Sequence, residues 1–285
     1  MEEQWNYEDK REEGKMNRLK PIHGILLFIV VMVSFYTVIA WAQMKWGMYG
    51  LALTELYLLA LALGGAKLLK VPFKEVFPVQ RPRWQKVFAV LLCWIASYSA
   101  VVPLTMIVAY FFPREIFFVS GSLNDFMATV PLALSVFISC VMPAVCEEAV
   151  HRGFILKSFQ SRIKGEWTLV VLMGLLFGLF HGNLWRFLPT ALLGAALTYL
   201  MVETENMIYP AIFHFINNFF PTLLSGMATA AGGGPDTQAV TQSLMENGLP
   251  LSFLGIYIGM GCVAPFCFYT AAYLLRRGVP GKEQR

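Results

Sequence analysis

Charged residues are scarce in this sequence: only 14% of its 285 residues are Asp, Glu, Lys or Arg, whereas 57% are hydrophobic. A soluble globular domain carries about 25% charged and about 45–50% apolar residues. The composition therefore excludes an ordinary soluble domain and indicates a polytopic membrane protein. The net charge of +4 by itself suggests a nucleic-acid partner, but the positions of the charges indicate a lipid bilayer, and we expect no nucleic-acid partner.

Several common signatures are also missing. The five cysteines lie in apolar stretches without paired spacing, which predicts neither a disulfide framework nor a zinc ribbon. Cys146 precedes Glu147 and could be a nucleophile, but buried cysteines usually behave as small hydrophobic residues. The sequence has no internal repeat and no cleavable signal peptide is expected. We expect a charged leader at 1–21, one membrane domain at 22–276 and a tail at 277–285.

Apolar stretches long enough to cross about 30 Å of hydrocarbon occur eight times. They lie at about 22–42, 48–66, 87–111, 129–154, 167–185, 187–203, 206–225 and 250–275. The sequence therefore predicts an all-α bundle of about eight transmembrane helices with its active site inside the bundle. The connection 226–249 is predicted to be an external loop, and its Ala230–Pro235 stretch of Ala, Gly and Pro is expected to be mobile.

The basic residues are distributed unevenly between the two sides of this predicted bundle. If the amino terminus is cytoplasmic, eighteen of the 22 Lys and Arg residues fall in inside segments, three fall outside, and Arg152 lies in a helix. Cytoplasmic loops carry an excess of Lys and Arg, so both termini are predicted to be cytoplasmic. The style of the sequence fits a bacterial plasma membrane better than an organelle.

Polar residues enter the apolar sequence in three short, widely separated segments. They are Glu147-Glu148-Ala-Val-His-Arg152, Phe177-Gly-Leu-Phe-His181 and His214-Phe-Ile-Asn-Asn218. Ionisable groups inside a membrane are costly unless they face one another or a wet cavity, so such a cluster indicates a functional site.

Helical spacing predicts how these side chains are used. Residues four apart share a helix face, so Glu148 should pair with Arg152 while Glu147 points elsewhere. On the same grounds Phe177 should lie beside His181, and His214 beside Asn218. A carboxylate base, imidazoles and an amide that donates to an oxyanion are sufficient for acyl transfer to water.

One distance disagrees with this convergence. At about 1.5 Å per residue, Glu147 lies about 15 Å from Lys157 at the inner end of its helix, but His181 lies about 25 Å from Lys164. The fifth helix must therefore be tilted or shifted inward for His181 to reach Glu147.

In this order and on separate helices, the three motifs resemble those of the CPBP family. That family comprises the type II CAAX prenyl proteases and the bacterial bacteriocin-processing or Abi proteins, and the resemblance covers roughly residues 129–225. It implies a glutamate-dependent intramembrane endopeptidase acting on a peptide or membrane-protein substrate. By resemblance, Glu147 with His181 activates water, His214 and Asn218 hold the oxyanion, and Glu148, Arg152 and Phe177 are structural.

Two alternatives accompany this interpretation. A zinc ion held by Glu147, His181 and His214 would make the enzyme a metalloprotease, although the sequence has no His-Glu-x-x-His helix. We expect no cofactor, because Asn218 is a poor zinc ligand. The same cluster could also serve a non-enzymatic scaffold, an immunity factor or a proton-coupled transporter.

Other polar residues receive structural assignments. His23 and His151 are predicted to form hydrogen bonds between helices, and Glu203 and Glu205 to be solvated in a short cytoplasmic turn. Glu55 lies in the middle of the second apolar stretch and is either a second functional carboxylate or the partner of a group on a neighbouring helix.

Overall fold

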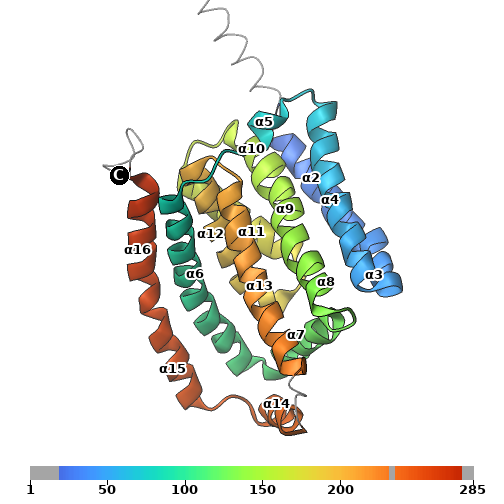
Figure 1. The fold of residues 1–285 in the computed structure, drawn as a ribbon, viewed down its shortest axis with the longest axis vertical. Coiled ribbons are helices and arrows are strands. Elements are labelled where there is room, and N and C mark those ends of the chain that lie inside the picture. The colour runs from blue at the N-terminus through green and yellow to red at the C-terminus, as the bar shows by residue number, and fades with distance from the viewer. Residues whose placement is uncertain (1–18, 231–234, 278–285) are drawn as a thin grey trace, which may run out of the picture.

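The computed structural model describes residues 19–230 and 235–277, and these residues form helices and connections without any strand (Figure 1). In chain order the helices are α2 (Pro21–Ser34), η1 (Phe35–Ile39), α3 (Ala40–Trp46), α4 (Met48–Leu68), α5 (Phe73–Val76), α6 (Trp84–Phe111), α7 (Pro113–Met127), α8 (Leu132–Val136), η2 (Phe137–Val141), α9 (Met142–Glu148), η3 (Ala149–Ile155), α10 (Leu156–Gln160), α11 (Glu166–Phe180), η4 (Leu184–Arg186), α12 (Phe187–Thr204), α13 (Ile208–Ala230), α14 (Pro235–Asn247), α15 (Leu251–Gly261) and α16 (Val263–Arg276). The segments η1, η2 and η3 are π-helical and η4 is a 3₁₀ turn.

Six helical runs of the described chain are long and apolar enough to cross a membrane, so the protein is a multi-pass membrane protein. They are Pro21–Trp46, Met48–Leu68, Trp84–Phe111, Leu132–Gln160, Leu184–Thr204 and Leu251–Arg276. Each corresponds to one of the eight predicted apolar stretches, which confirms the all-helical membrane class.

The two remaining predicted spans are helices of a different character. Helix α11 has 15 residues, which rise about 22 Å and fall short of the bilayer core. Helix α13 has 23 residues and is long enough, but His214, Asn217 and Asn218 make it less apolar. Both helices belong to the segment that carries the second and third motifs.

Two regions predicted as connections are helical. Helix α7 occupies most of the connection between the third and fourth spans. The prediction that 226–249 is a loop is wrong for most of that range, because α13 continues to Ala230 and α14 covers Pro235–Asn247. Residues 231–234 of the expected mobile stretch lie outside the described residues. Helix α7 is amphipathic rather than uniformly apolar, which explains why a search for apolar runs missed it.

Hydrogen bonds join distant connections at one end of the bundle. The side chain of Asn206 accepts from the backbone N–H of Gln80 at 3.2 Å and donates to its carbonyl at 2.9 Å. The hydroxyl of Tyr209 accepts from the N–H of Arg83 at 2.9 Å. Figure 1 places α5, α10 and the end of α16 at this same end, and α7 and α14 at the opposite end. Segments predicted to share one side of the membrane therefore lie together.

Candidate active site

The first motif lies in the middle of a helix that is not a regular α-helix. The run Leu132–Gln160 contains two π-helical segments, and the second begins directly after Glu148. Single π-turns inside α-helices are rare and are frequent at functional sites. Glu147 is 8% exposed, whereas Glu148 and Arg152 are fully buried. Three ionisable side chains are thus enclosed within two helical turns.

Glu148 is the centre of a buried charge network that connects two motifs. One of its oxygens, Oε1, accepts from Nη1 of Arg152 at 2.9 Å, which is the pair that the spacing predicted. The same oxygen accepts from Nδ1 of His214 at 2.8 Å. A carboxylate that bonds one imidazole nitrogen fixes the ring orientation and leaves Nε2 as the nitrogen that faces the site. The contact between Glu148 and His214 was not foreseen from the sequence.

Glu147 approaches the other nitrogen of the same imidazole. Its Oε2 lies 3.8 Å from Nε2 of His214, which is too long for a direct hydrogen bond. This oxygen is buried and has no hydrogen-bond partner in the described part of the chain. A gap of this length between two polar atoms is compatible with a bridging water molecule. The carboxylates of the two adjacent glutamates therefore face opposite nitrogens of the His214 ring.

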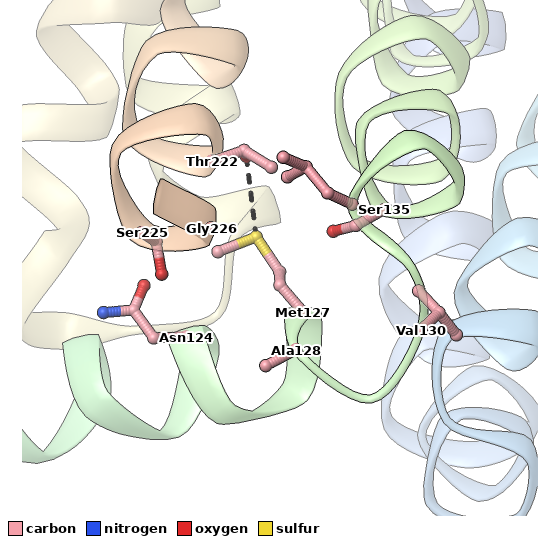
Figure 2. Close-up of a pocket in the computed structure, with 9 residues that line it drawn as sticks. Asn124, Met127, Ala128, Val130, Ser135, Thr222, Ser225 and Gly226 are labelled. Atoms are coloured by element: carbon pink, nitrogen blue, oxygen red, sulfur yellow. Dashed lines mark hydrogen bonds between the residues drawn. The ribbon is translucent and has the colours of Figure 1, made fainter. Parts of the chain in front are cut away.

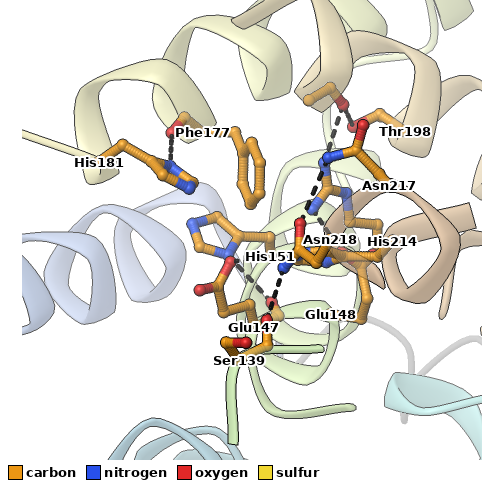
Figure 3. A network of polar contacts seen from close by, with 12 residues as sticks. Ser139, Glu147, Glu148, His151, Phe177, His181, Thr198, His214, Asn217 and Asn218 are labelled. Carbon is orange, nitrogen blue, oxygen red and sulfur yellow. Dashed lines mark hydrogen bonds and ion pairs between the residues drawn. The ribbon is translucent and has the colours of Figure 1, made fainter. Parts of the chain in front are cut away.

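Phe177 is the apolar centre around which the histidines are arranged. Its ring centroid lies 4.7 Å from that of His181, 5.8 Å from that of His214 and 5.1 Å from that of His151. The guanidinium carbon of Arg152 lies 4.4 Å from the same centroid, a cation–π geometry. Figure 3 shows Phe177 and the three histidines converging from η3, from α11 and the residue that follows it, and from α13. The predicted contact between Phe177 and His181 is present.

A glycine on α12 allows this packing. A Cβ atom built at Gly194 would lie 2.6 Å from Cβ of Phe177, so any other residue would push α11 away. The carbonyl of Gly194 accepts from Nη2 of Arg152 at 2.9 Å. Helix α12 carries none of the three motifs, yet it supports both the first and the second.

Hydrogen bonds at both the nitrogen and the oxygen of its side-chain amide orient Asn218. Its Nδ2 donates to the carbonyl of Ser139 at 3.0 Å, and its Oδ1 accepts from Nδ2 of Asn217 at 3.3 Å (Figure 3). An amide nitrogen carries two hydrogens, so one N–H stays available for a ligand. Ser139 lies outside the three motif segments, whereas Asn217 lies inside the third, next to Asn218. The sequence offers no signal for their role beyond the polarity of Asn217.

His181 is the site residue whose placement matches the prediction least closely. It immediately follows α11, and its Nδ1 donates to the carbonyl of Phe177 at 2.9 Å. Within residues 19–230 and 235–277 it makes no hydrogen bond to Glu147. The next residue, Gly182, has a φ of +60°, which favours glycine and turns the chain back at this point. His181 shares the Phe177 ring with His214 but does not reach the carboxylate directly.

His151 lies deeper in the site than its predicted structural role suggested. The expectation of a bond between helices is wrong, because its Nδ1 donates to the carbonyl of Glu147 in its own helix at 3.0 Å. Its side chain is fully buried, and Nε2 has no partner among the described residues. The four-residue spacing from Glu147 was visible in the sequence and could have shown that the two share a face. His23 also bonds locally, to the N–H of Lys20.

Two other glutamates, Glu203 and Glu55, are buried rather than solvated. Glu203 was predicted to be solvated, but it is 4% exposed and pairs with Arg276 at 2.7 Å, because α16 packs beside the end of α12. Glu205, in contrast, is exposed.

Glu55 on α4 is 2% exposed, and its Oε2 has no hydrogen-bond partner in the described residues. Glu55 lies within electrostatic range of Glu147.

The donor geometry does not fit the zinc alternative. A catalytic zinc ion takes three protein ligands at about 2.0–2.3 Å. Of the three residues in the zinc alternative, only Glu147 and His214 approach each other, with 3.8 Å between Oε2 and Nε2. In the described chain no three His, Cys, Asp or Glu residues converge closely enough to hold a metal ion. We therefore derive no step that passes through a metal.

The comparison with protein families agrees with the site. Residues 129–220 match the family model described as type II CAAX prenyl endopeptidase Rce1-like, which spans α8 to most of α13 and includes all three motifs. This chain therefore carries a domain of the CPBP family of membrane peptidases. No curated protein and no solved structure matched the chain.

Proposed function

We propose that the protein is an intramembrane endopeptidase that hydrolyses a peptide bond with a water molecule activated by Glu147. The observation that carries this proposal is the position of His214 between two buried glutamates, at 2.8 Å from Glu148 and 3.8 Å from Glu147. Glu148 is neutralised by Arg152 and holds the ring, whereas Glu147 has a buried oxygen without a partner in the described residues. The first carboxylate is structural, and the second is available for chemistry.

The reaction assigns one task to each group. Glu147 accepts a proton from water as the oxygen attacks the scissile carbonyl, and it returns that proton to the amine nitrogen as the C–N bond breaks. His214, through its Nε2 side, and the unused N–H of Asn218 hold the oxyanion of the tetrahedral intermediate. Water, peptide and products balance without an external reactant.

Two histidines are proposed to position the water. With Nδ1 bonded to the Glu147 carbonyl, the Nε2 atom of neutral His151 is an acceptor, and it lies one helical turn from Glu147. His181 has the same arrangement, because its Nδ1 bonds the Phe177 carbonyl. An imidazole acceptor beside the phenyl ring can bond one hydrogen of the water molecule, and the other hydrogen is then left for Glu147. His181 thus supports Glu147 through water rather than by direct contact.

A purified-enzyme assay tests the proposal. The protein is reconstituted in liposomes with quenched fluorescent peptides that resemble membrane-protein tails, leader peptides and prenylated peptides. Cleavage by the wild type and loss of cleavage in Glu147→Gln support it, with Glu75→Gln on the exposed face of α5 as the matched control. Proton-coupled uptake without any cleavage would contradict it and favour a transporter.

We also propose that both termini are cytoplasmic and that the membrane is a bacterial plasma membrane. The support is the excess of Lys and Arg in alternate connections and the clustering of those connections at one end of the bundle. A leader peptide, a pheromone precursor or a membrane-protein tail is the preferred substrate class over a prenylated protein.

A further inference from the structure

A cavity of about 190 Å³ lies between α7, α8 and α13 (Figure 2). Helix α7 lies at the end of the bundle opposite α5 (Figure 1). Its lining consists of Asn124, Met127, Ala128, Val130, Leu132, Ser135, Thr222, Ser225 and Gly226. None of these side chains is charged, and four of them carry a hydroxyl or an amide. Neither the family match nor the proposed mechanism gives this cavity a role.

One lining residue indicates that the cavity takes a polar ligand. Ser135 is 2% exposed, and its Oγ has no hydrogen-bond partner among the described residues. Figure 2 shows this hydroxyl pointing from α8 towards α13. A buried hydroxyl without a partner is unfavourable, so a ligand group that bonds this oxygen would be stabilised.

The cavity is connected to the proposed active site through two helices. Thr222 donates to the backbone carbonyl of Asn218 at 2.8 Å, one turn along α13. Asn218 donates to the carbonyl of Ser139, whose hydroxyl donates to the carbonyl of Ser135 at 2.7 Å. Asn218 on α13, the proposed oxyanion donor, is therefore linked through Ser139 to Ser135 on α8, which carries the unpartnered hydroxyl.

The spacing matches that of an extended peptide. One helical turn separates Asn218 from Thr222, a rise of about 6 Å. An extended chain advances about 3.3 Å per residue, and every second side chain points to the same side. A peptide whose scissile carbonyl is held by Asn218 can thus place the side chain two residues away into the cavity.

We propose that this cavity is a substrate subsite for a small, uncharged side chain with hydrogen-bonding capacity, such as Ser, Thr or Asn, two residues from the scissile carbonyl. This inference rests on the proposed endopeptidase activity. The uncharged lining disfavours Asp and Lys, which would enter without a counter-charge. The Ser135 hydroxyl favours a polar side chain over an aliphatic one of similar size.

A set of peptides that differ only at this position tests the subsite. For the wild type we expect kcat/KM to be about three- to tenfold higher for Thr than for the near-isosteric Val, as one hydrogen bond provides, and lowest for Asp and Lys. Ser135→Ala should abolish the preference for Thr over Val. Ser122→Ala, on the exposed face of α7 with its hydroxyl bonded to the Phe118 carbonyl, is the matched control.

A second variant tests the volume of the cavity without touching the hydroxyl. Ala128→Leu at the exposed rim should lower kcat/KM for Asn peptides more than for Ala peptides. Glu147-dependent cleavage with the same profile in the wild type, Ser135→Ala and Ala128→Leu would overturn the subsite and leave the endopeptidase intact. Absence of cleavage of every peptide by the wild type would overturn both.

Discussion

The central and the outer helices of this bundle differ in how many of their residues are buried inside the protein. In the most apolar stretches of Leu132–Gln160 and Leu184–Thr204, 61% of the residues are buried inside the protein, whereas none are buried in that of Leu251–Arg276. The three runs have similar hydropathy, so composition alone does not distinguish them. The central runs are enclosed by protein, and the outer run presents its apolar surface to the surroundings.

The difference shows what permits ionisable groups at membrane depth. Glu147, Glu148 and Arg152 lie in an enclosed run, where each has a polar group of another helix within reach. The outer run carries its charge only at its last residue, Arg276, beside the end of α12. Burial by neighbouring helices, rather than depth alone, makes a buried charge network tolerable.

The largest effect is expected from a substitution of Glu147, and it distinguishes this residue from the neighbouring Glu148. Glu147→Gln should lower kcat by about 10²–10⁴-fold, as expected for loss of a general base, while expression and thermal stability in detergent stay near wild type. Single-turnover cleavage by the purified variant measures the loss. Wild-type turnover by Glu147→Gln would transfer the role of base to Glu148.

The next effect concerns the third motif. Asn218→Ala should lower kcat by about 10²–10³-fold with little change in KM, because one oxyanion donor is removed. Asn247→Ala, on the exposed helix α14, serves as the control for an amide outside the central helices. An increase in KM with unchanged kcat would instead make Asn218 a substrate-binding residue.

A third prediction compares the two ion pairs directly. Arg152→Ala should destabilise the protein by about 3–5 kcal/mol, because Glu148 is left as a buried charge without its main partner. Arg276→Ala should cost clearly less, because its side chain is 23% exposed and water can replace it. Thermal unfolding in one detergent measures both. Equal losses would remove the distinction between the enclosed and the outer helices.

The smallest effect is expected from metal removal. Hydrolysis by the wild type should be unchanged after dialysis against a chelator, because only two potential ligands of the zinc alternative approach each other. Metal analysis of the dialysed protein provides the control. Loss of activity together with stoichiometric zinc, and recovery on re-addition, would make Glu147, His181 and His214 ligands.

Labelling tests the orientation without altering activity. After replacement of the five native cysteines, single cysteines in 70–86 and 157–164 should react only from the cytoplasmic side, and those in 239–247 only from outside. Impermeant thiol reagents on intact cells and inverted vesicles give the two readouts. Reversed labelling would refute the argument from charge distribution.

Sequence reasoning identified what local spacing determines. The pair Glu148–Arg152 and the contact between Phe177 and His181 follow from residues four apart, and both are present. The eight apolar stretches all correspond to helices. The contact between Glu148 and His214 joins residues 66 positions apart, and no local pattern encodes such a distance.

The wrong predictions have two physical causes, a lack of uniform apolarity and contacts between residues far apart in the sequence. Helix α7 and helix α14 lack the uniform apolarity that marks a span, so both were assigned to connections. The sequence predicts a solvated Glu203 because it places this residue in a short turn, but Arg276, which pairs with it, is 73 residues away. The π-turns around Glu147 depend on packing between helices and leave no periodic signal in the sequence.

The shortness of α11 has a consequence for the surrounding lipid. Trp167, Val171, Leu175 and Leu179 form an exposed apolar stripe along this 15-residue helix. A helix of about 22 Å is mismatched to about 30 Å of hydrocarbon, and a bilayer adapts to a short hydrophobic segment by thinning. Because His181 follows the last residue of the helix, we expect a bilayer that thins around α11 to bring headgroups and water close to it. On this argument the activity should decrease in bilayers of longer acyl chains.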